Sequence, residues 1–463
     1  MGRYLLTGAQ IVTGAESKKG ALAIDGRKIE KIWYENEDGT IDAAPLHPDT
    51  EVIDLNGMVL MAGGIDAHVH FREPGSTQKA DMESESKAAL LGGITSVIDM
   101  PNNNPPAVSE DTIEAKHEIA RQKMWTNWSF NIGVTNTNAD EVRRLIAEKP
   151  DLFAGVKVFM GSSTGGMLVD NDNTLSDIFS IQEKPVLIHS EDEAIIRANL
   201  EKAKQQYGDD IPMREHPNIR SRMACIKTSI KALEIAMQKG TRLHVCHLST
   251  AEEVHMVRAA KLHTNRITAE SSANYMFFTD KDYDNLGARV KCNPSVKTDN
   301  DRQLIRDAFH DGIIDTIGSD HAPHLLSEKD APYTKGPSGM PSIQQSFAAV
   351  VTAALQEETP LTRVASAMSE RCAEIFKIKD RGFIKEGYEA DLVVIDTETE
   401  FTVGDAAENS SARIDYKCGW SPYEGMKLKG GVKMVFLGGE KVVENGLLLV
   451  EKTKPVQLTF EKA

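Results

Sequence analysis

The stretch Gly64-Ile-Asp-Ala-His-Val-His-Phe-Arg-Glu-Pro-Gly75 follows an apolar run, Met58-Val-Leu-Met61, and places two histidines two positions apart. In a β-strand, residues two apart point to the same side, so His68 and His70 can reach one metal ion. Arg72 is a fixed cation suited to binding a carboxylate through two parallel hydrogen bonds. Together these residues predict a metallohydrolase for a small acidic substrate. A lone His-x-His pair is as often part of a core strand, so this prediction depends on the rest of the chain.

The surrounding region, residues 56–375, alternates apolar strand-like runs with amphipathic segments. Two helix starts are marked by the capping-box patterns Ser190-Glu-Asp-Glu193 and Ser249-Thr-Ala-Glu252. Repeated strand-helix units of this length predict an α/β fold, a (β/α)8 TIM-like barrel whose chemistry gathers at the carboxyl ends of its strands. The expected strands include residues 95–99, 155–159, 185–189, 243–247 and 314–318.

The two ends of the chain, residues 1–55 and 376–463, both consist of short strand-like runs separated by glycine and polar residues. Neither end has enough apolar length to form a core alone. We therefore expect one small composite β-sandwich domain, built from both ends, beside a barrel domain that spans residues 56–375.

Further candidate metal ligands stand at the ends of expected barrel strands. His189 and His247 each end a strand, and Asp320 ends another in Gly318-Ser-Asp-His-Ala-Pro-His324. An aspartate there can bind metal and accept a proton from water, although it could also be a helix N-cap. His244, three positions before His247, is expected to be a core residue.

Lys157 is a lone lysine among apolar neighbours in Gly155-Val-Lys-Val-Phe-Met160. A lysine that points into a barrel would be a costly unpaired charge. Either a salt bridge or carbamylation by CO2 would resolve this. A carbamate would offer two oxygens, one for each of two metal ions.

The composition narrows the class of protein. The 463 residues carry a net charge of −16 and no basic run long enough to follow a nucleic acid, and no stretch of about 18 apolar residues predicts a membrane span. The five cysteines are scattered, with neither zinc-knuckle spacing nor a disulfide framework. These features indicate a reduced, cytoplasmic protein with no nucleic-acid partner.

The chain resembles a known family. Asp66 to Gly75 and Gly318 to His324 are similar to the two signature segments of the amidohydrolase superfamily, and within it of the cyclic amidases. Met100-Pro-Asn-Asn-Asn-Pro105 is similar to a substrate-binding loop of the long, barrel-plus-sandwich dihydroorotases. The segment 382–394 resembles the return of that family into its small β-domain.

The resemblance implies roles for individual residues. His68, His70 and Asp320 would hold one Zn2+, and His189 and His247 a second. N6-carboxylated Lys157 and a hydroxide would bridge the two ions, and Asp320 would also be the catalytic proton carrier. The residues that would bind substrate are Arg72, Asn102, Asn293 and His324.

The function that the resemblance implies is the reversible hydrolysis of the cyclic amide of L-dihydroorotate to N-carbamoyl-L-aspartate, a step of pyrimidine biosynthesis. Allantoinase and dihydropyrimidinase or hydantoinase are the alternatives, but their substrates lack the carboxylate that Arg72 would bind. A catalytically inactive scaffold is a third, which the complete set of ligands disfavours. A homodimer is also implied. The segment 325–340, rich in glycine, proline and charge, is either part of the site or a plain connector.

Overall fold

A computed structural model describes residues 2–161, 166–169, 171–405 and 410–461 of the chain. Eight parallel strands form one sheet in the order β13-β12-β11-β10-β9-β8-β7-β6. A parallel bridge between Val69 and His321 joins β6 to the segment that follows β13. The eight strands are β6 (Gly64–Val69), β7 (Ile94–Asp99), β8 (Asn127–Gly133), β9 (Gly155–Phe159), β10 (Val186–His189), β11 (Leu243–Val245), β12 (Ile267–Ser272) and β13 (Thr316–Gly318).

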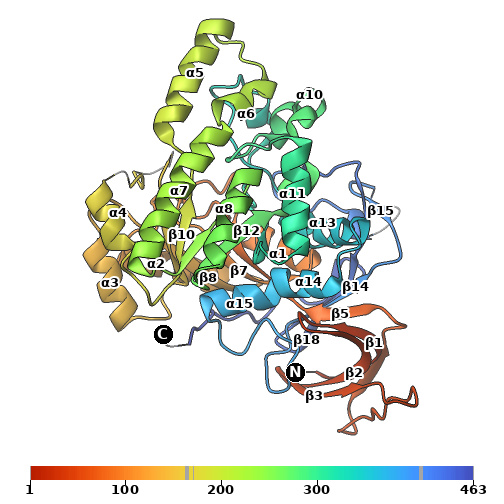
Figure 1. Cartoon of the computed structure of the whole chain (residues 1–463). Coiled ribbons are helices and arrows are strands. Elements are labelled where there is room, and N and C mark those ends of the chain that lie inside the picture. Colours follow the sequence, from red (N-terminus) through yellow and green to blue (C-terminus); the bar gives the residue numbers. More distant parts are fainter. Residues whose placement is uncertain (1, 162–165, 170, 406–409, 462–463) are drawn as a thin grey trace.

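Helices surround this sheet (Figure 1), so the predicted (β/α)8 barrel is confirmed. The strands are buried on both faces, which is why they read as nearly continuous apolar runs in the sequence. The longer helices are α1 (Met82–Leu91), α2 (Glu110–Lys123), α3 (Ala139–Glu148), α5 (Glu193–Tyr207), α7 (Arg222–Lys239), α8 (Ala251–Lys261), α11 (Asp299–His310) and α13 (Ile343–Gln356). The shorter ones are α4 (Asp172–Ile178), α6 (His216–Ile219), α9 (Ala273–Phe277), α10 (Tyr283–Leu286), α12 (Leu326–Lys329), α14 (Leu361–Ala365) and α15 (Arg371–Phe376).

The two helix starts that the sequence marked lie slightly further along the chain than expected. The N-cap of α5 is Asp192, whose side chain accepts from the backbone N–H of Ile195, and not Ser190. The N-cap of α8 is Thr250, one residue after Ser249. In both places several adjacent residues have capping side chains, so the pattern alone does not select one.

Both chain ends contribute to a second, mixed sheet, as predicted. Its order is β19-β18-β17-β14-β5-β1-β2-β3, with β4 paired to β1, and it lies beside the barrel in Figure 1. Its strands are β1 (Arg3–Val12), β2 (Ser17–Asp25), β3 (Lys28–Tyr34), β4 (Glu51–Asp54), β5 (Val59–Ala62), β14 (Leu392–Asp396), β17 (Gly431–Leu437), β18 (Glu440–Glu444) and β19 (Leu447–Leu448). A separate pair joins β15 (Phe401–Thr402) and β16 (Lys427–Leu428).

Segments near the expected domain boundaries connect the barrel with the second sheet. The strand β5 lies within the predicted barrel range, yet it pairs with β1 and β14, where its apolar side chains are buried. In the other direction, Trp420 reaches the barrel, where its indole N–H donates to the carbonyl of His324 at 2.8 Å. Near the C-terminus, Leu458 donates its backbone N–H to Trp128 of β8.

Within the described part of the chain, no helix is long and apolar enough to cross a membrane. All five cysteines are free thiols, and only Cys418 is more than slightly exposed.

Candidate active site

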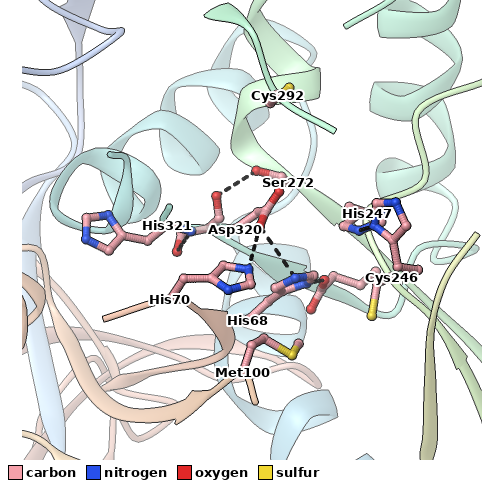
Figure 2. Close-up of polar contacts among 12 residues, drawn as sticks. His68, His70, Met100, Cys246, His247, Ser272, Cys292, Asp320 and His321 are labelled. Atoms are coloured by element: carbon pink, nitrogen blue, oxygen red, sulfur yellow. Dashed lines mark hydrogen bonds and ion pairs between the residues drawn. The ribbon is translucent and has the colours of Figure 1, made fainter. Parts of the chain in front are cut away.

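One cavity of about 320 Å3 opens at the carboxyl ends of the barrel strands, and all ten of the predicted site residues line it. They come from six strand ends and two loops, which the barrel brings together. Figure 2 shows His68 and His70 directed at Asp320, with His247 on the opposite side. The remaining lining residues are Phe159, Ala322, Pro337, Ser338 and Gly339.

The first group of candidate metal ligands is His68, His70 and Asp320. The Nε2 atoms of His68 and His70 lie 3.5 and 3.2 Å from the same oxygen, Oδ1 of Asp320. Burial opposes the ionised form of Asp320, but the neighbouring imidazoles outweigh it and hold the pKa of this carboxyl below its usual range. Asp320 is therefore a carboxylate at neutral pH, available as a ligand and a proton acceptor.

The second group is His189 and His247. Nδ1 of His189 lies 2.9 Å from Nε2 of His247, while Nε2 of His189 lies 2.9 Å from Glu191 and donates to it. Burial lowers the pKa of both imidazoles, so both are neutral at pH 7. Their facing nitrogens suit a shared cation, and Nδ1 of His247 is buried with no hydrogen-bond partner.

Lys157 lines the same cavity as the two groups. Its side chain is buried, and Nζ lies 3.2 Å from Sγ of Cys246 and 5.3 Å from the ring centre of Phe159. No carboxylate of the described residues lies within 4.0 Å of this amine. The salt bridge that the sequence left open is thus not formed, and a carbamate would turn an uncompensated buried cation into an anionic ligand.

The donor set fits divalent cations. Three imidazoles each have one ring nitrogen at hydrogen-bond distance from an oxygen, so the other ring nitrogen is directed at the cavity. The acceptors are Glu270 for His68, Asn102 for His70 and Glu191 for His189. Neutral imidazoles and a carboxylate are ligands that Zn2+ accepts.

Sequence reasoning missed two of these orienting residues. Glu270, in β12, accepts from Nδ1 of His68 at 2.6 Å, and Glu191 also forms an ion pair with Arg220. Both glutamates are almost fully buried. Glu270 could have been found because a carboxylate inside a buried strand is unusual. Glu191 could have been found because it follows the strand that ends with the candidate ligand His189.

The other end of the cavity is cationic. Arg72 donates from Nε to the carbonyl of Pro323, and its Nη2 lies 3.0 Å from Nε2 of His324. Lys79 lies 3.1 Å from Nδ1 of the same imidazole. In the described ranges no carboxylate lies within 4.0 Å of the Arg72 guanidinium. Burial lowers the pKa of Arg72 to about 10, so this side chain remains charged at neutral pH without an acidic partner.

Two asparagines complete the lining. Asn102 uses its carbonyl oxygen to hold His70, which is a positioning contact in addition to the substrate contact predicted for it. Asn293 has a buried Oδ1 with no hydrogen-bond partner, at the wall of the cavity. An acceptor of this kind suits a ring N–H of a bound molecule.

Three of the lining residues have left-handed backbone conformations, with φ of 63° at Arg72, 37° at His247 and 47° at Asp320. This conformation is unfavourable for residues with a side chain, and it clusters at functional sites where the surrounding structure imposes it. All three side chains line the cavity.

Two further histidines near the site do not line the cavity. His321 is buried and pairs with Glu85 at 2.8 Å, and it points away from the ligands in Figure 2. His244 is a core residue, as expected, with Nε2 3.8 Å from Glu270 and Nδ1 2.9 Å from Thr268.

Residues 59–442 match the model of the amidohydrolase family. The chain belongs to this family. A dihydroorotase from Methanosarcina acetivorans is 32% identical over 416 residues, which cover 88% of this chain and 84% of that protein. A dihydroorotase from Pyrococcus horikoshii is 30% identical over 426 residues, which cover 92% and 88%. The resemblance seen in the sequence is thus confirmed, and the protein is a cyclic amidohydrolase.

Solved structures of other amidohydrolases share the fold. An L-hydantoinase (dihydropyrimidinase) from Arthrobacter aurescens superposes with a TM-score of 0.88 at 24% identity over 98% of both chains. A dihydropyrimidinase from Brevibacillus agri superposes with a TM-score of 0.85 at 23% identity over 100% of both chains. At these identities the likeness concerns the fold and not the substrate.

Proposed function

We propose that this amidohydrolase is a dihydroorotase, which opens and closes the cyclic amide of L-dihydroorotate in pyrimidine biosynthesis. The observation that carries the proposal is the Arg72 guanidinium, charged, lining the cavity and without a carboxylate partner among the described residues. A substrate carboxylate would supply the missing anion through two parallel hydrogen bonds. Named relatives at about 30% identity support the same substrate.

The residues at the two ends of the cavity would have different roles. Arg72 and His324 would hold the substrate carboxylate, while Oδ1 of Asn293 would accept a ring N–H. This fixes the scissile amide toward Asp320. Asp320 would take the proton of the attacking water and pass it to the leaving ring nitrogen.

Two Zn2+ ions, held by the two histidine groups and Asp320 and bridged by carboxylated Lys157, would lower the pKa of the attacking water and polarise the scissile carbonyl. The carbamate would form when Nζ of Lys157, having lost one proton, attacks CO2 and releases a second proton. The cavity side chains support this arrangement, because Lys157 lines the same cavity as both groups and has no acidic partner in the described structure.

The competing substrates are neutral rings, such as dihydrouracil and allantoin. They would leave the Arg72 charge buried without an anion, which is costly.

The resemblance to long-type dihydroorotases also implies a homodimer in the cytoplasm, and light scattering of the purified protein tests the assembly.

The test is a side-by-side assay of the zinc-loaded protein on L-dihydroorotate, dihydrouracil and allantoin. We expect turnover of dihydroorotate, lost in Arg72→Ala and partly kept in Arg72→Lys, which retains the charge without the planar fork. Turnover of a neutral ring with dihydroorotate ignored would overturn the proposed substrate and leave the amidohydrolase assignment intact.

A further inference from the structure

Two buried lysines outside the proposed metal site have no acidic partner. The side chains of Lys291 and Lys329 are 5% and 1% exposed, and no carboxylate in the described part of the chain lies within 4.0 Å of either amine. A buried ammonium is costly unless other groups compensate it. What these amines contact therefore indicates why they are there.

Lys291 stands two residues before Asn293 of the cavity wall. Its Nζ donates to the carbonyls of Tyr333 and Gly336, at 2.7 and 2.6 Å, and lies 4.2 Å from the ring centre of Tyr333. His216 adds a second link, because its two ring nitrogens lie 2.8 Å from the Tyr333 hydroxyl and from the Cys292 carbonyl. The Asn293 segment is thus tied to the chain around residues 333–336.

Lys329 completes the connection from α12. Its Nζ donates to the carbonyls of Lys291, Pro337 and Gly339, at 3.1, 3.0 and 2.9 Å. The backbone N–H of Gly339 donates to the Lys291 carbonyl as well, at 2.8 Å. Residues 332–340, here called the cavity loop, contain no helix or strand, and these two amines take up four of its carbonyls.

The cavity loop in turn contacts the cationic end of the site. The backbone carbonyl oxygen of Ser338 lies 3.1 Å from Nε2 of His324, and a Cβ added to Gly339 would lie 3.0 Å from Cδ2 of the same imidazole. The lysines therefore act on His324 and Asn293 through the loop, and they do not line the cavity themselves.

The cationic end of the cavity and the residues around it carry an excess of positive charge. Arg72, Lys79, Lys291 and Lys329 gather there, and Glu328 compensates only Lys79, at 2.9 Å. Burial lowers the pKa of Lys329 to about 7 and of Lys291 to about 8, with neighbouring cations adding to the effect. An anion bound at Arg72 would stabilise the charged form of both amines.

We propose that Lys291 and Lys329 are positioning residues that hold the Asn293 segment and the cavity loop together as one wall, and so set the affinity of the site for an anionic ring. The kinetic part of this inference rests on the proposed function. It assigns to two buried lysines a role in setting substrate affinity, from outside the cavity.

The experiment compares Lys329→Met, Lys291→Met and Lys329→Gln with a matched control, Lys335→Met. Lys335 is an exposed lysine of the same cavity loop. Its replacement removes one charge but none of the contacts that join the cavity loop to the Asn293 segment. We expect KM for L-dihydroorotate to rise about tenfold in Lys329→Met and Lys291→Met, with kcat and zinc content kept. Lys329→Gln keeps N–H donors without charge, so an intermediate KM separates the two contributions.

Amide hydrogen exchange of residues 332–340 gives a readout that needs no substrate. We expect faster exchange there in Lys329→Met than in Lys335→Met, while barrel strand β8 stays protected. If the wild-type protein does not turn over dihydroorotate, the proposed function fails. The exchange comparison still tests whether Lys329 holds the cavity loop. Unchanged KM in Lys329→Met and Lys291→Met, together with unchanged exchange in Lys329→Met, would overturn the inference. A variant that loses zinc and kcat together would show a general folding defect and also contradict it.

Discussion

Glu270 accepts a 2.6 Å hydrogen bond from Nδ1 of His68, deep under the cavity. Burial favours the neutral carboxyl, but His68 and His244 outweigh it and hold the pKa of Glu270 well below its usual range. His68 is correspondingly basic, with a pKa of about 10, because Glu270 and Asp320 overcome the effect of burial. This pair fixes which nitrogen of His68 faces the cavity and strengthens it as a ligand.

We therefore predict that Glu270→Gln weakens zinc binding by about 10- to 100-fold while the barrel still folds. The amide keeps the size of the side chain but loses the charge that favours His68 as a ligand. Competition with a chromophoric chelator measures the affinity. Glu234→Gln, on the exposed face of α7, is the control, and equal zinc affinity in the two variants would contradict the prediction.

Lys157→Ala removes the proposed bridge between the two metal groups. We expect zinc content to fall from about two ions per chain to one or fewer, with loss of turnover. Short carboxylic acids should restore part of the activity, since they can occupy the space of the carbamate. Full activity in the variant without added acid would show that Lys157 is not a bridge.

The strand ends could be read from the sequence because barrel strands are buried apolar runs, and a polar residue at the end of such a run stands out. His189 and Asp320 were found in this way, and both line the cavity. The fold class followed from the same alternation of strands and helices.

The supporting contacts could not be read in this way. Glu191 and Arg220 are separated by 29 positions, and Trp420 contacts His324 from 96 positions away. Such pairs carry no spacing signal, because only the folded chain brings them together. The strand β5 was assigned to the barrel for a related reason, since its apolar run suits either sheet.

Gly339 offers a direct test of the cavity loop. Its φ is 143°, and an added Cβ would lie 2.4 Å from the Ala322 carbonyl oxygen, so the backbone of Gly339→Ala must shift. We expect kcat/KM for the ring substrate to fall by about tenfold or more, because the loop packs on His324. Gly387→Ala is the matched control, since Gly387 also has a positive φ, of 83°, but no neighbour within 4 Å. Equal activity of the two variants would show that the cavity loop does not affect turnover.

His117 sets a pH dependence of stability away from the metal ligands. It is buried between α2 and β8, lies 2.9 Å from the carbonyl of Leu152 and accepts from the indole N–H of Trp128. Burial lowers the pKa of His117 to about 4 in the folded protein, whereas an unfolded histidine titrates near pH 6.5. Between these values only the unfolded chain takes up the proton, so the free energy of unfolding must fall as the pH drops from about 6.5 to about 4.

The difference in pKa corresponds to at most about 3 kcal/mol of unfolding free energy across this window. We expect His117→Gln, which keeps a donor and an acceptor, to be less stable at pH 7 but to lose less stability on acidification. Urea unfolding of metal-free wild type and variant, at pH 7 and at pH 4.5, measures both free energies. His310→Gln, at the end of α11, is the control, because its imidazole is only partly buried. Parallel losses in wild type and His117→Gln would show that other groups control the acid sensitivity.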